Sequence, residues 1–248
     1  PSNAKVLVFG SKLNLSKNTG AFDFNLGCSG YIYGLGLAKS LISSNMANSV
    51  LLVMSDTYSK HINKLDFANR SIFGDGATAS IVESNETECL YEFVFGTDGS
   101  GFKNLIIPNG GAKNRFEENA KLIELKNGNK NTKNNLYMNG PEIFNFTIEI
   151  TPKLINDVLE KNQKNIDEID YFIFHQANSF MLNYLRKKMR IPKVKFHNNM
   201  HETGNTVSST IPIALKDCIE NKFVNSGDLV LLCGFGVGYS WGAALIRI

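Results

Sequence analysis

One cysteine stands where a polypeptide chain can activate a thiol. Cys28 follows Gly27 in the stretch A-F-D-F-N-L-G-C-S-G. The alternating apolar residues of Ala21–Leu26 predict a buried strand, and a helical pattern begins at about Ser29. Cys28 is therefore expected at the amino end of a helix, where unpaired N–H groups and the helix dipole favour a thiolate nucleophile. The competing interpretation is an ordinary buried cysteine, which is common in protein cores.

Two more polar residues occupy places suited to chemistry. His175 directly follows the apolar run Ile169–Phe174, where it could donate a hydrogen bond or act as a base. Asn205 lies in the glycine turn T-G-N-T ahead of a predicted helix, so it holds in the second half the place that Cys28 holds in the first. The alternatives are a structural histidine and an asparagine that forms a turn or caps the helix.

The predicted elements around these residues occur twice in the same order. The first set is the helix after Cys28, the apolar strand Ser49–Ser55, a glycine turn and the small-residue strand G-A-T-A-S-I-V. The second set is the helix Ile211–Asn221, the apolar strand Asp228–Cys233, a glycine turn and the strand Trp241–Ile248. This repetition predicts an α/β fold of two related halves with mostly parallel buried strands. Helix starts related by such a repeat should converge on one centre.

Bulk composition excludes several classes of protein. The 248 residues are 43% hydrophobic with a net charge of +3, which allows a sizeable core and gives no argument for nucleic acid binding. No apolar run approaches the ~20 residues of a membrane span, and no signal peptide is visible, so we expect a cytoplasmic protein. The four cysteines are scattered without a C-x-x-C motif, which indicates neither a disulfide framework nor a zinc ribbon.

Two other groups of residues have simple interpretations beside functional ones. His197 and His201 have the spacing of a metal-binding helix, but the intervening N-N-M does not favour a helix and no third ligand is evident, so we expect no metal site. The predicted helix Ser179–Arg190 carries a basic face made of Arg186, Lys187 and Lys188. This face is either simply solvated or a docking surface for an acidic carrier protein.

Seven motifs resemble those of β-ketoacyl-acyl-carrier-protein synthase III enzymes of the thiolase superfamily. They are A-F-D-F-N-L-G-C-S-G, I-F-G-D-G-A, T-D-G-S-G, Y-M-N-G-P-E-I-F, F-H-Q-A-N, T-G-N-T-V-S-S-T-I-P and G-F-G-V-G-Y-S-W-G-A-A-L-I-R. They follow the family's order and cover nearly the whole chain, so the resemblance is specific. H-Q-A-N with G-N-T separates this group from elongating synthases, which use two histidines, and from degradative thiolases, which add a second cysteine near the carboxyl terminus.

The resemblance implies a thiolase-like layered α/β fold of two pseudo-symmetric halves. Residues 1–110 are expected to be the remainder of the amino-terminal half, and residues 111–248 the carboxyl-terminal half. The family's amino-terminal region, which helps to bind coenzyme A, is not in this sequence, so we expect the first half to be incomplete here. The resemblance also implies a homodimer formed through the first half, with the active sites near the interface.

The resemblance further implies a Cys–His–Asn site, carried over to Cys28, His175 and Asn205. Cys28 attacks an acyl thioester and becomes acylated. Malonyl carrier then loses carbon dioxide, and the enolate, hydrogen-bonded by His175 and Asn205, attacks the acyl group. The backbone N–H groups of Cys28 and Val237 are expected to form the oxyanion hole. Acyl-coenzyme A and malonyl-acyl carrier protein are the implied substrates, and no cofactor is expected.

One departure from the family pattern leaves the acyl donor and the carrier open. Phe180 stands five residues after His175, where an arginine implicated in carrier docking often occurs. The expected function is an acyltransferase of fatty acid biosynthesis. The alternatives are a related enzyme that makes an ester, amide or branched product in secondary metabolism or surface-glycan biosynthesis, and a non-catalytic family member that acts as a partner subunit. The presence of all three site residues favours an enzyme.

Overall fold

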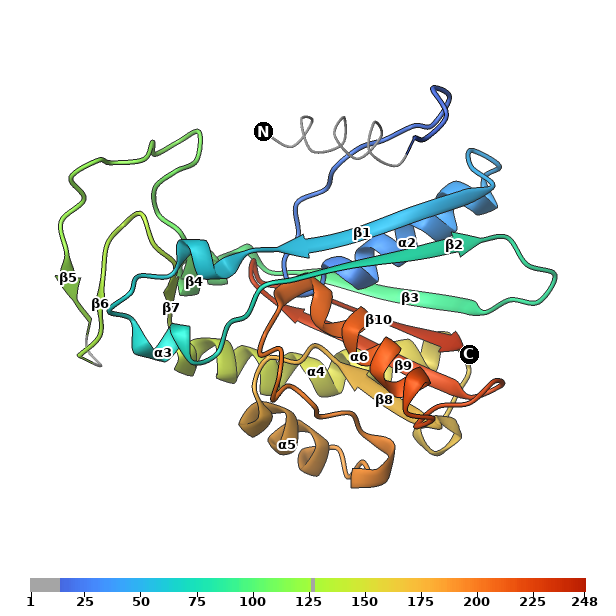
Figure 1. The fold of residues 1–248 in the computed structure, drawn as a ribbon. Coiled ribbons are helices and arrows are strands. Elements are labelled where there is room, and N and C mark those ends of the chain that lie inside the picture. The colour runs from blue at the N-terminus through green and yellow to red at the C-terminus, as the bar shows by residue number, and fades with distance from the viewer. Residues whose placement is uncertain (1–13, 126–127) are drawn as a thin grey trace.

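A four-stranded mixed sheet forms the centre of the fold (Figure 1). The computed structural model describes residues 14–125 and 128–248. The central sheet has the order β3-β10-β9-β8, formed by β3 Leu90–Thr97, β10 Ser240–Arg247, β9 Leu229–Gly236 and β8 Tyr171–Phe174. A second sheet pairs β1 Ser49–Asp56 with β2 Gly76–Glu83.

Helices cover both faces of the central sheet. They are α2 Gly30–Ser43, α4 Gly140–Lys161, α5 Ser179–Lys188 and α6 Thr210–Glu220. The short helix α3 Phe67–Arg70 lies away from this sheet (Figure 1). Side chains of α4 and α5 pack with Leu231 and Cys233 of β9, and side chains of α2 and α6 pack with its alternate residues Val230 and Leu232. Because β9 is covered on both faces, every one of its residues is buried, which explains its continuous apolar run. No described helix is long and apolar enough to cross a membrane.

The layers follow one another as sheet, helices, sheet, helices. Leu52 and Met54 of β1 pack on α2, so the β1–β2 sheet lies on the far side of the α2–α6 layer. The predicted order of helix, strand and small-residue strand recurs as α2–β1–β2 and α6–β9–β10. The remaining elements are β4 Leu105–Ile106, β5 Ile123–Glu124, β6 Lys130–Asn131, β7 Tyr137–Met138 and the 3-10 helices η1 Tyr58–His61, η2 Gly99–Asn104, η3 Ile166–Glu168, η4 Lys193–Lys195 and η5 Val207–Ser209.

The prediction of mostly parallel strands is wrong. Among the described strands, only β8 and β9 pair in parallel, whereas β1–β2, β9–β10 and β10–β3 are antiparallel. The connection explains the β9–β10 pair, since only residues 237–239 separate these strands. A parallel pair needs a crossover of about a dozen residues or more, and so short a turn can only produce a hairpin.

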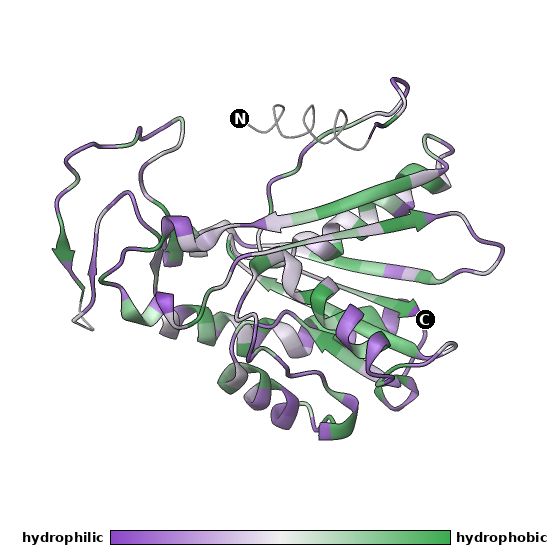
Figure 2. Ribbon diagram, viewed as in Figure 1, coloured by the Kyte–Doolittle hydropathy of each residue, from purple (hydrophilic) through white to green (hydrophobic). Residues whose placement is uncertain are grey.

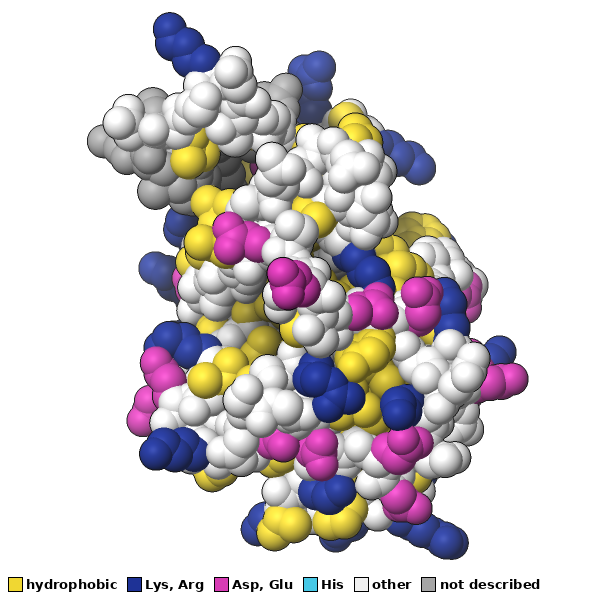
Figure 3. Space-filling model, turned by 90° about the vertical axis from the view of Figure 1, so that its right-hand side faces the viewer, with side chains coloured by type: hydrophobic (Ala, Val, Ile, Leu, Met, Phe, Trp, Pro, Cys, Tyr) yellow, Lys and Arg dark blue, Asp and Glu magenta, His cyan; other side chains and the backbone are white. Residues whose placement is uncertain are grey.

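Two segments are less buried than their apolar sequences predict. Residues 21–26 form no strand, and Phe22 is 60% exposed, because no described strand lies alongside to supply the hydrogen bonds that a strand requires. In the β1–β2 sheet, Leu51 is 41% exposed and Ile81 is 68% exposed, because described helices cover only the opposite face. Figure 2 shows hydrophobic residues along the strands of both sheets, and Figure 3 shows charges of both signs interspersed on one face.

The predicted division at residues 110 and 111 stays a prediction. Strand β3 precedes this boundary, yet it pairs with β10 from Thr97 opposite Ser240 to Leu90 opposite Ile246. The central sheet therefore contains strands from both sides of the predicted boundary.

We expect Gly74→Ala to lower the free energy of unfolding by about 1–3 kcal/mol through overpacking. A Cβ atom on Gly74 would lie 2.0 Å from the backbone oxygen of Thr203, which cannot rotate away. Urea-induced unfolding measures the change. The matched control is Gly111→Ala, since nothing lies within 4 Å of a Cβ there. Equal stability of the two variants would contradict this account of the close approach.

Candidate active site

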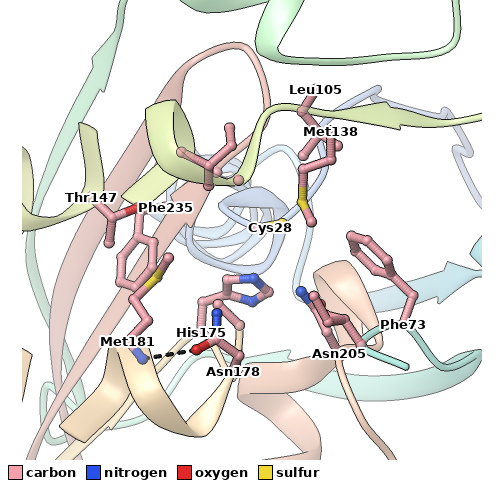
Figure 4. A pocket seen from close by; sticks show the side chains of 15 residues that line it. Cys28, Phe73, Leu105, Met138, Thr147, His175, Asn178, Met181, Asn205 and Phe235 are labelled. Carbon is pink, nitrogen blue, oxygen red and sulfur yellow. Dashed lines mark hydrogen bonds between the residues drawn. The ribbon is translucent and has the colours of Figure 1, made fainter. Parts of the chain in front are cut away.

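The structure brings the three predicted site residues to one cavity of about 120 Å³ (Figure 4). Cys28 lies two residues before the start of α2, His175 follows the last residue of β8, and Asn205 lies two residues before η5. Their convergence depends on the packing of α2 against β9 and on the pairing of β8 with β9. The arrangement unites residues from three distant parts of the sequence.

Cys28 lies at the carboxyl end of β9. It is 4% exposed, and a Cβ atom on Gly236 would lie 2.7 Å from its sulfur, so only glycine permits this close approach. The backbone N–H groups of Val237 and of Cys28 itself act to lower the pKa of the thiol. The oxyanion hole formed by these two N–H groups stays a prediction.

The predicted thiolate is not the resting form of Cys28. Burial and, to a smaller extent, the nearby Asp56 carboxylate raise the pKa of the thiol to about 12, against the lowering effect of the Val237 N–H. The cost of burying a charge therefore exceeds the stabilisation expected from the start of the helix. Attack on a thioester requires a base that removes the thiol proton.

His175 is the base available in the cavity. It is 2% exposed, and burial lowers its pKa from 6.5 to about 3, so the imidazole is neutral near pH 7. Its Nδ1 atom lies 2.7 Å from the Thr210 hydroxyl, which leaves Nε2 as the ring nitrogen for chemistry. Its backbone N–H donates to the Cys233 carbonyl at 2.7 Å, and this hydrogen bond fixes the residue to β9.

Asn205 is held by its backbone and by its side chain. Its N–H donates to the Ile72 carbonyl at 2.9 Å, and its carbonyl accepts from the Gly74 N–H at 3.0 Å. The side-chain Oδ1 accepts from the Val207 N–H at 2.9 Å, so the amide NH₂ group is left for the cavity that Asn205 lines. Asn205 is thus both the turn residue of the alternative interpretation and a donor group at the site.

Asp56 lies outside the cavity lining but acts on Cys28, a role that the sequence analysis missed. It ends β1 and accepts hydrogen bonds from the Ser208 hydroxyl and, at 3.1 Å, from the Ser208 N–H. Its carboxylate also raises the pKa of Cys28. The available signal was an acidic residue directly after an apolar strand. The apolar lining was also missed and includes Ile72, Phe73, Leu105, Met138, Ile143, Met181 and Phe235.

Two of the three basic side chains of α5 donate to backbone carbonyls. Arg186 is partly buried and donates to the Ile191 carbonyl at 3.0 Å, and Lys188 donates to the Ile148 carbonyl at 2.7 Å. Lys187 and Lys188 are exposed, as is Phe180, the second residue of the helix, which is 73% exposed and packs on Phe144 with ring centroids 5.7 Å apart.

His197 and His201 do not converge. His197 is buried, with Nδ1 3.1 Å from the Cys218 sulfur and Nε2 3.4 Å from an Asp217 oxygen, whereas His201 lies exposed in a turn. Within residues 14–125 and 128–248, no group of three or more His, Cys, Asp or Glu residues could hold a metal ion. His197 therefore takes part in a buried contact beneath α6.

Comparison with known proteins identifies the family. Residues 22–99 match the family 3-Oxoacyl-[acyl-carrier-protein (ACP)] synthase III, and residues 159–248 match its C-terminal family. The chain is 38% identical over 234 residues to the beta-ketoacyl-[acyl-carrier-protein] synthase III of Clostridium perfringens (strain 13 / Type A), covering 94% of this chain and 69% of that relative. The chain belongs to the synthase III family.

Further relatives agree with this membership. The corresponding synthase III of Fusobacterium nucleatum subsp. nucleatum is 35% identical over 243 residues, covering 96% of this chain and 70% of that relative. A 2.1 Å crystal structure of a 3-oxoacyl-(acyl-carrier-protein) synthase III superposes with a TM-score of 0.96 at 43% identity, covering 100% of this chain and 74% of that one. The crystal structure of a 3-oxoacyl-(acyl-carrier protein) synthase from Burkholderia xenovorans LB400 superposes with a TM-score of 0.88 at 37% identity, covering 98% of this chain and 68% of that one. The predicted thiolase-like α/β fold is confirmed.

The neutral, buried His175 makes the stability of this synthase III family member dependent on pH. The pKa of His175 is lower in the folded protein than in the unfolded chain, so its contribution is complete above pH 6.5 and is lost as the pH falls toward 3. Each pH unit in this window removes up to about 1.4 kcal/mol of unfolding free energy. Urea unfolding at pH 7, 6 and 5 should show a shallower pH dependence for His175→Gln. The variant His201→Gln, at an exposed position, is the control and should keep the wild-type slope.

Proposed function

We propose that the protein joins an acyl thioester to a malonyl carrier by decarboxylative Claisen condensation, with Cys28 as the acylated nucleophile. The observation that carries this proposal is the convergence of a thiol, an imidazole and an amide on one cavity. The relatives named beta-ketoacyl-[acyl-carrier-protein] synthase III support the same reaction.

In the first step, Cys28 takes up the acyl group. His175 Nε2 accepts the thiol proton, as the raised pKa of Cys28 requires, and the sulfur attacks the carbonyl carbon of the acyl thioester. The oxyanion of the tetrahedral intermediate accepts hydrogen bonds from the backbone N–H groups of Cys28 and Val237. The carbon–sulfur bond to coenzyme A then breaks, and the departing thiolate takes the proton from His175, which returns to its neutral form.

In the second step, the malonyl thioester loses carbon dioxide. The bond between the carboxylate and the methylene carbon breaks, and its electron pair forms an enolate whose oxygen accepts hydrogen bonds from the Asn205 amide and from His175. The enolate carbon attacks the acyl carbonyl, the bond to the Cys28 sulfur breaks, and the released thiolate takes a proton from solvent. The apolar lining of the cavity suits the acyl chain.

The substrates and partners implied by this chemistry are acyl-coenzyme A as donor and malonyl-acyl carrier protein as acceptor, and no step of it uses a cofactor. The exposed Lys187 on α5, whose first turn contributes Met181 to the cavity, supports docking of an acidic carrier on this side. The homodimer is supported by the apolar residues Leu51 and Ile81 exposed on the β1–β2 sheet. The cytoplasmic location remains a prediction.

Cys28→Ser should abolish acylation. A serine hydroxyl is a far weaker nucleophile than a thiol at neutral pH, even with His175 as base. Intact-protein mass spectrometry after incubation with acyl-coenzyme A measures the added acyl mass. Cys89→Ser is the control, because Cys89 lies outside the cavity and should leave acylation intact. Full acylation of Cys28→Ser would mean that another residue is the nucleophile.

Asn205→Ala should still acylate but release carbon dioxide about a hundredfold more slowly, a loss of ~3 kcal/mol. The matched variant is Asn205→Asp, which keeps the Oδ1 acceptor for the Val207 N–H but has no amide donor. Both variants should lose carbon dioxide release from malonyl carrier while the mass of acyl-Cys28 is still gained. If Asn205→Asp keeps full activity, Asn205 is a turn residue only. Transfer of the acyl group to an alcohol or amine without carbon dioxide release would identify a different acyltransferase.

A further inference from the structure

One buried hydroxyl on the wall of the cavity has no hydrogen-bond partner. Thr147 of α4 lines the cavity that holds Cys28 and is fully buried, yet its Oγ1 atom has no partner among the described residues. A hydroxyl on a helix can donate to the carbonyl one turn earlier, as Ser40 and Ser44 of α2 do. Thr147 does not, and Figure 4 shows its hydroxyl directed from α4 toward Phe235. An unpaired buried hydroxyl is unfavourable, so this wall favours a ligand that supplies an acceptor.

The hydroxyl belongs to an otherwise apolar part of the cavity wall. Figure 4 shows Thr147 beside Phe235 and Met181, with Asn205 on the opposite side of the cavity. Apart from the three predicted site residues, Asn178 is the other polar side chain among the described residues of the lining. Its Oδ1 accepts from the Met181 N–H at 2.8 Å, and the residue is partly exposed, so solvent can reach its amide. Thr147 is therefore the fully buried donor of this part of the wall.

The proposed reaction brings one acceptor group into the cavity that has no donor assigned to it. The malonyl carboxylate is bonded to the methylene carbon that attacks the acyl group on Cys28, so it must enter the same cavity of about 120 Å³. A carboxylate buried against Phe235 and Met181 without a donor would lose its hydration without replacement, which is very unfavourable. A threonine hydroxyl can donate its one proton to a carboxylate oxygen. The hydroxyl of Thr147 thus fits the one charged group of the substrate that is due to react.

We propose that Thr147 is a specificity-determining residue whose hydroxyl donates a hydrogen bond to the malonyl carboxylate before decarboxylation. The inference rests on the proposed function and names the contact that distinguishes the malonyl thioester from an acyl thioester. When the carbon–carbon bond breaks, its electron pair passes to the enolate, carbon dioxide leaves without charge, and the hydroxyl keeps its proton. The contact is therefore made in the ground state and weakens as the charge moves to the enolate oxygen. Such a contact selects and binds the substrate and does not accelerate the bond cleavage.

The test compares Thr147→Val, which has nearly the same shape without a hydroxyl, with Thr147→Ser, which keeps the hydroxyl. In Thr147→Val, the KM of malonyl-acyl carrier protein for carbon dioxide release should rise about 10–100-fold, the effect of losing a hydrogen bond to a charged group, while kcat does not fall. Thr147→Ser should restore the wild-type KM. The control is Thr151→Val one turn further along α4, because the Thr151 hydroxyl is also buried and unpartnered but lies outside the cavity lining. An equal rise in the KM of acyl-coenzyme A would place the hydroxyl on the arm that both thioesters share and would overturn the inference.

Binding measurements separate this inference from the proposed function. Isothermal titration calorimetry compares the Kd of malonyl-coenzyme A with that of acetyl-coenzyme A in a Cys28→Ser, Asn205→Ala background, which should neither acylate nor readily release carbon dioxide. A preference for malonyl-coenzyme A that Thr147→Val lowers about 10–100-fold upholds the inference, even for a protein that condenses nothing. No preference in the background protein, or one that Thr147→Val leaves unchanged, overturns it, even where condensation proceeds normally. Should Thr147→Val fail to fold, Thr147→Ala removes the same hydroxyl and decides by the same comparison.

Discussion

The parallel pairing of β8 with β9 is the interaction on which the site depends. It places His175, the first residue after β8, beside Cys233. Gly236 lies three residues further along β9, against the Cys28 sulfur. Two parts of the site are thus positioned from one buried strand. Since β9 is covered on both faces by helices, neither residue can shift without disturbing the core.

Burial then sets the chemistry of the site. In a solvent-exposed setting, a thiol at a helix start would favour a thiolate, but here both Cys28 and His175 are held in their neutral forms. Charge therefore develops only when the substrate is present and the proton moves between them. In the proposed reaction the Val237 N–H and the Asn205 amide receive that charge, and the Asn205 side chain is already oriented by the Val207 N–H.

Sequence patterns predicted the elements with strong periodicity and the residues at their ends. The apolar runs gave β8 and β9, and the helical spacing gave α4, α5 and α6 within a few residues. The strand over Ala21–Leu26 failed because alternation alone cannot supply a pairing partner. Asp56 escaped notice because its partner, Ser208, lies 152 residues away in the sequence, and such a contact leaves no local pattern. The resting thiol was missed because burial depends on the assembled fold.

The close approach of Gly236 to Cys28 has a consequence for biosynthesis. Cys28 leaves the ribosome early, whereas the strand that covers it is made from the far end of the described chain. Until β9 emerges and inserts between its neighbours, the cysteine lacks both its covering backbone and the Val237 N–H. During synthesis the side chain is therefore an ordinary cysteine, as open to oxidants as any surface thiol. Its burial and its approach to the Val237 N–H arrive in the same folding event.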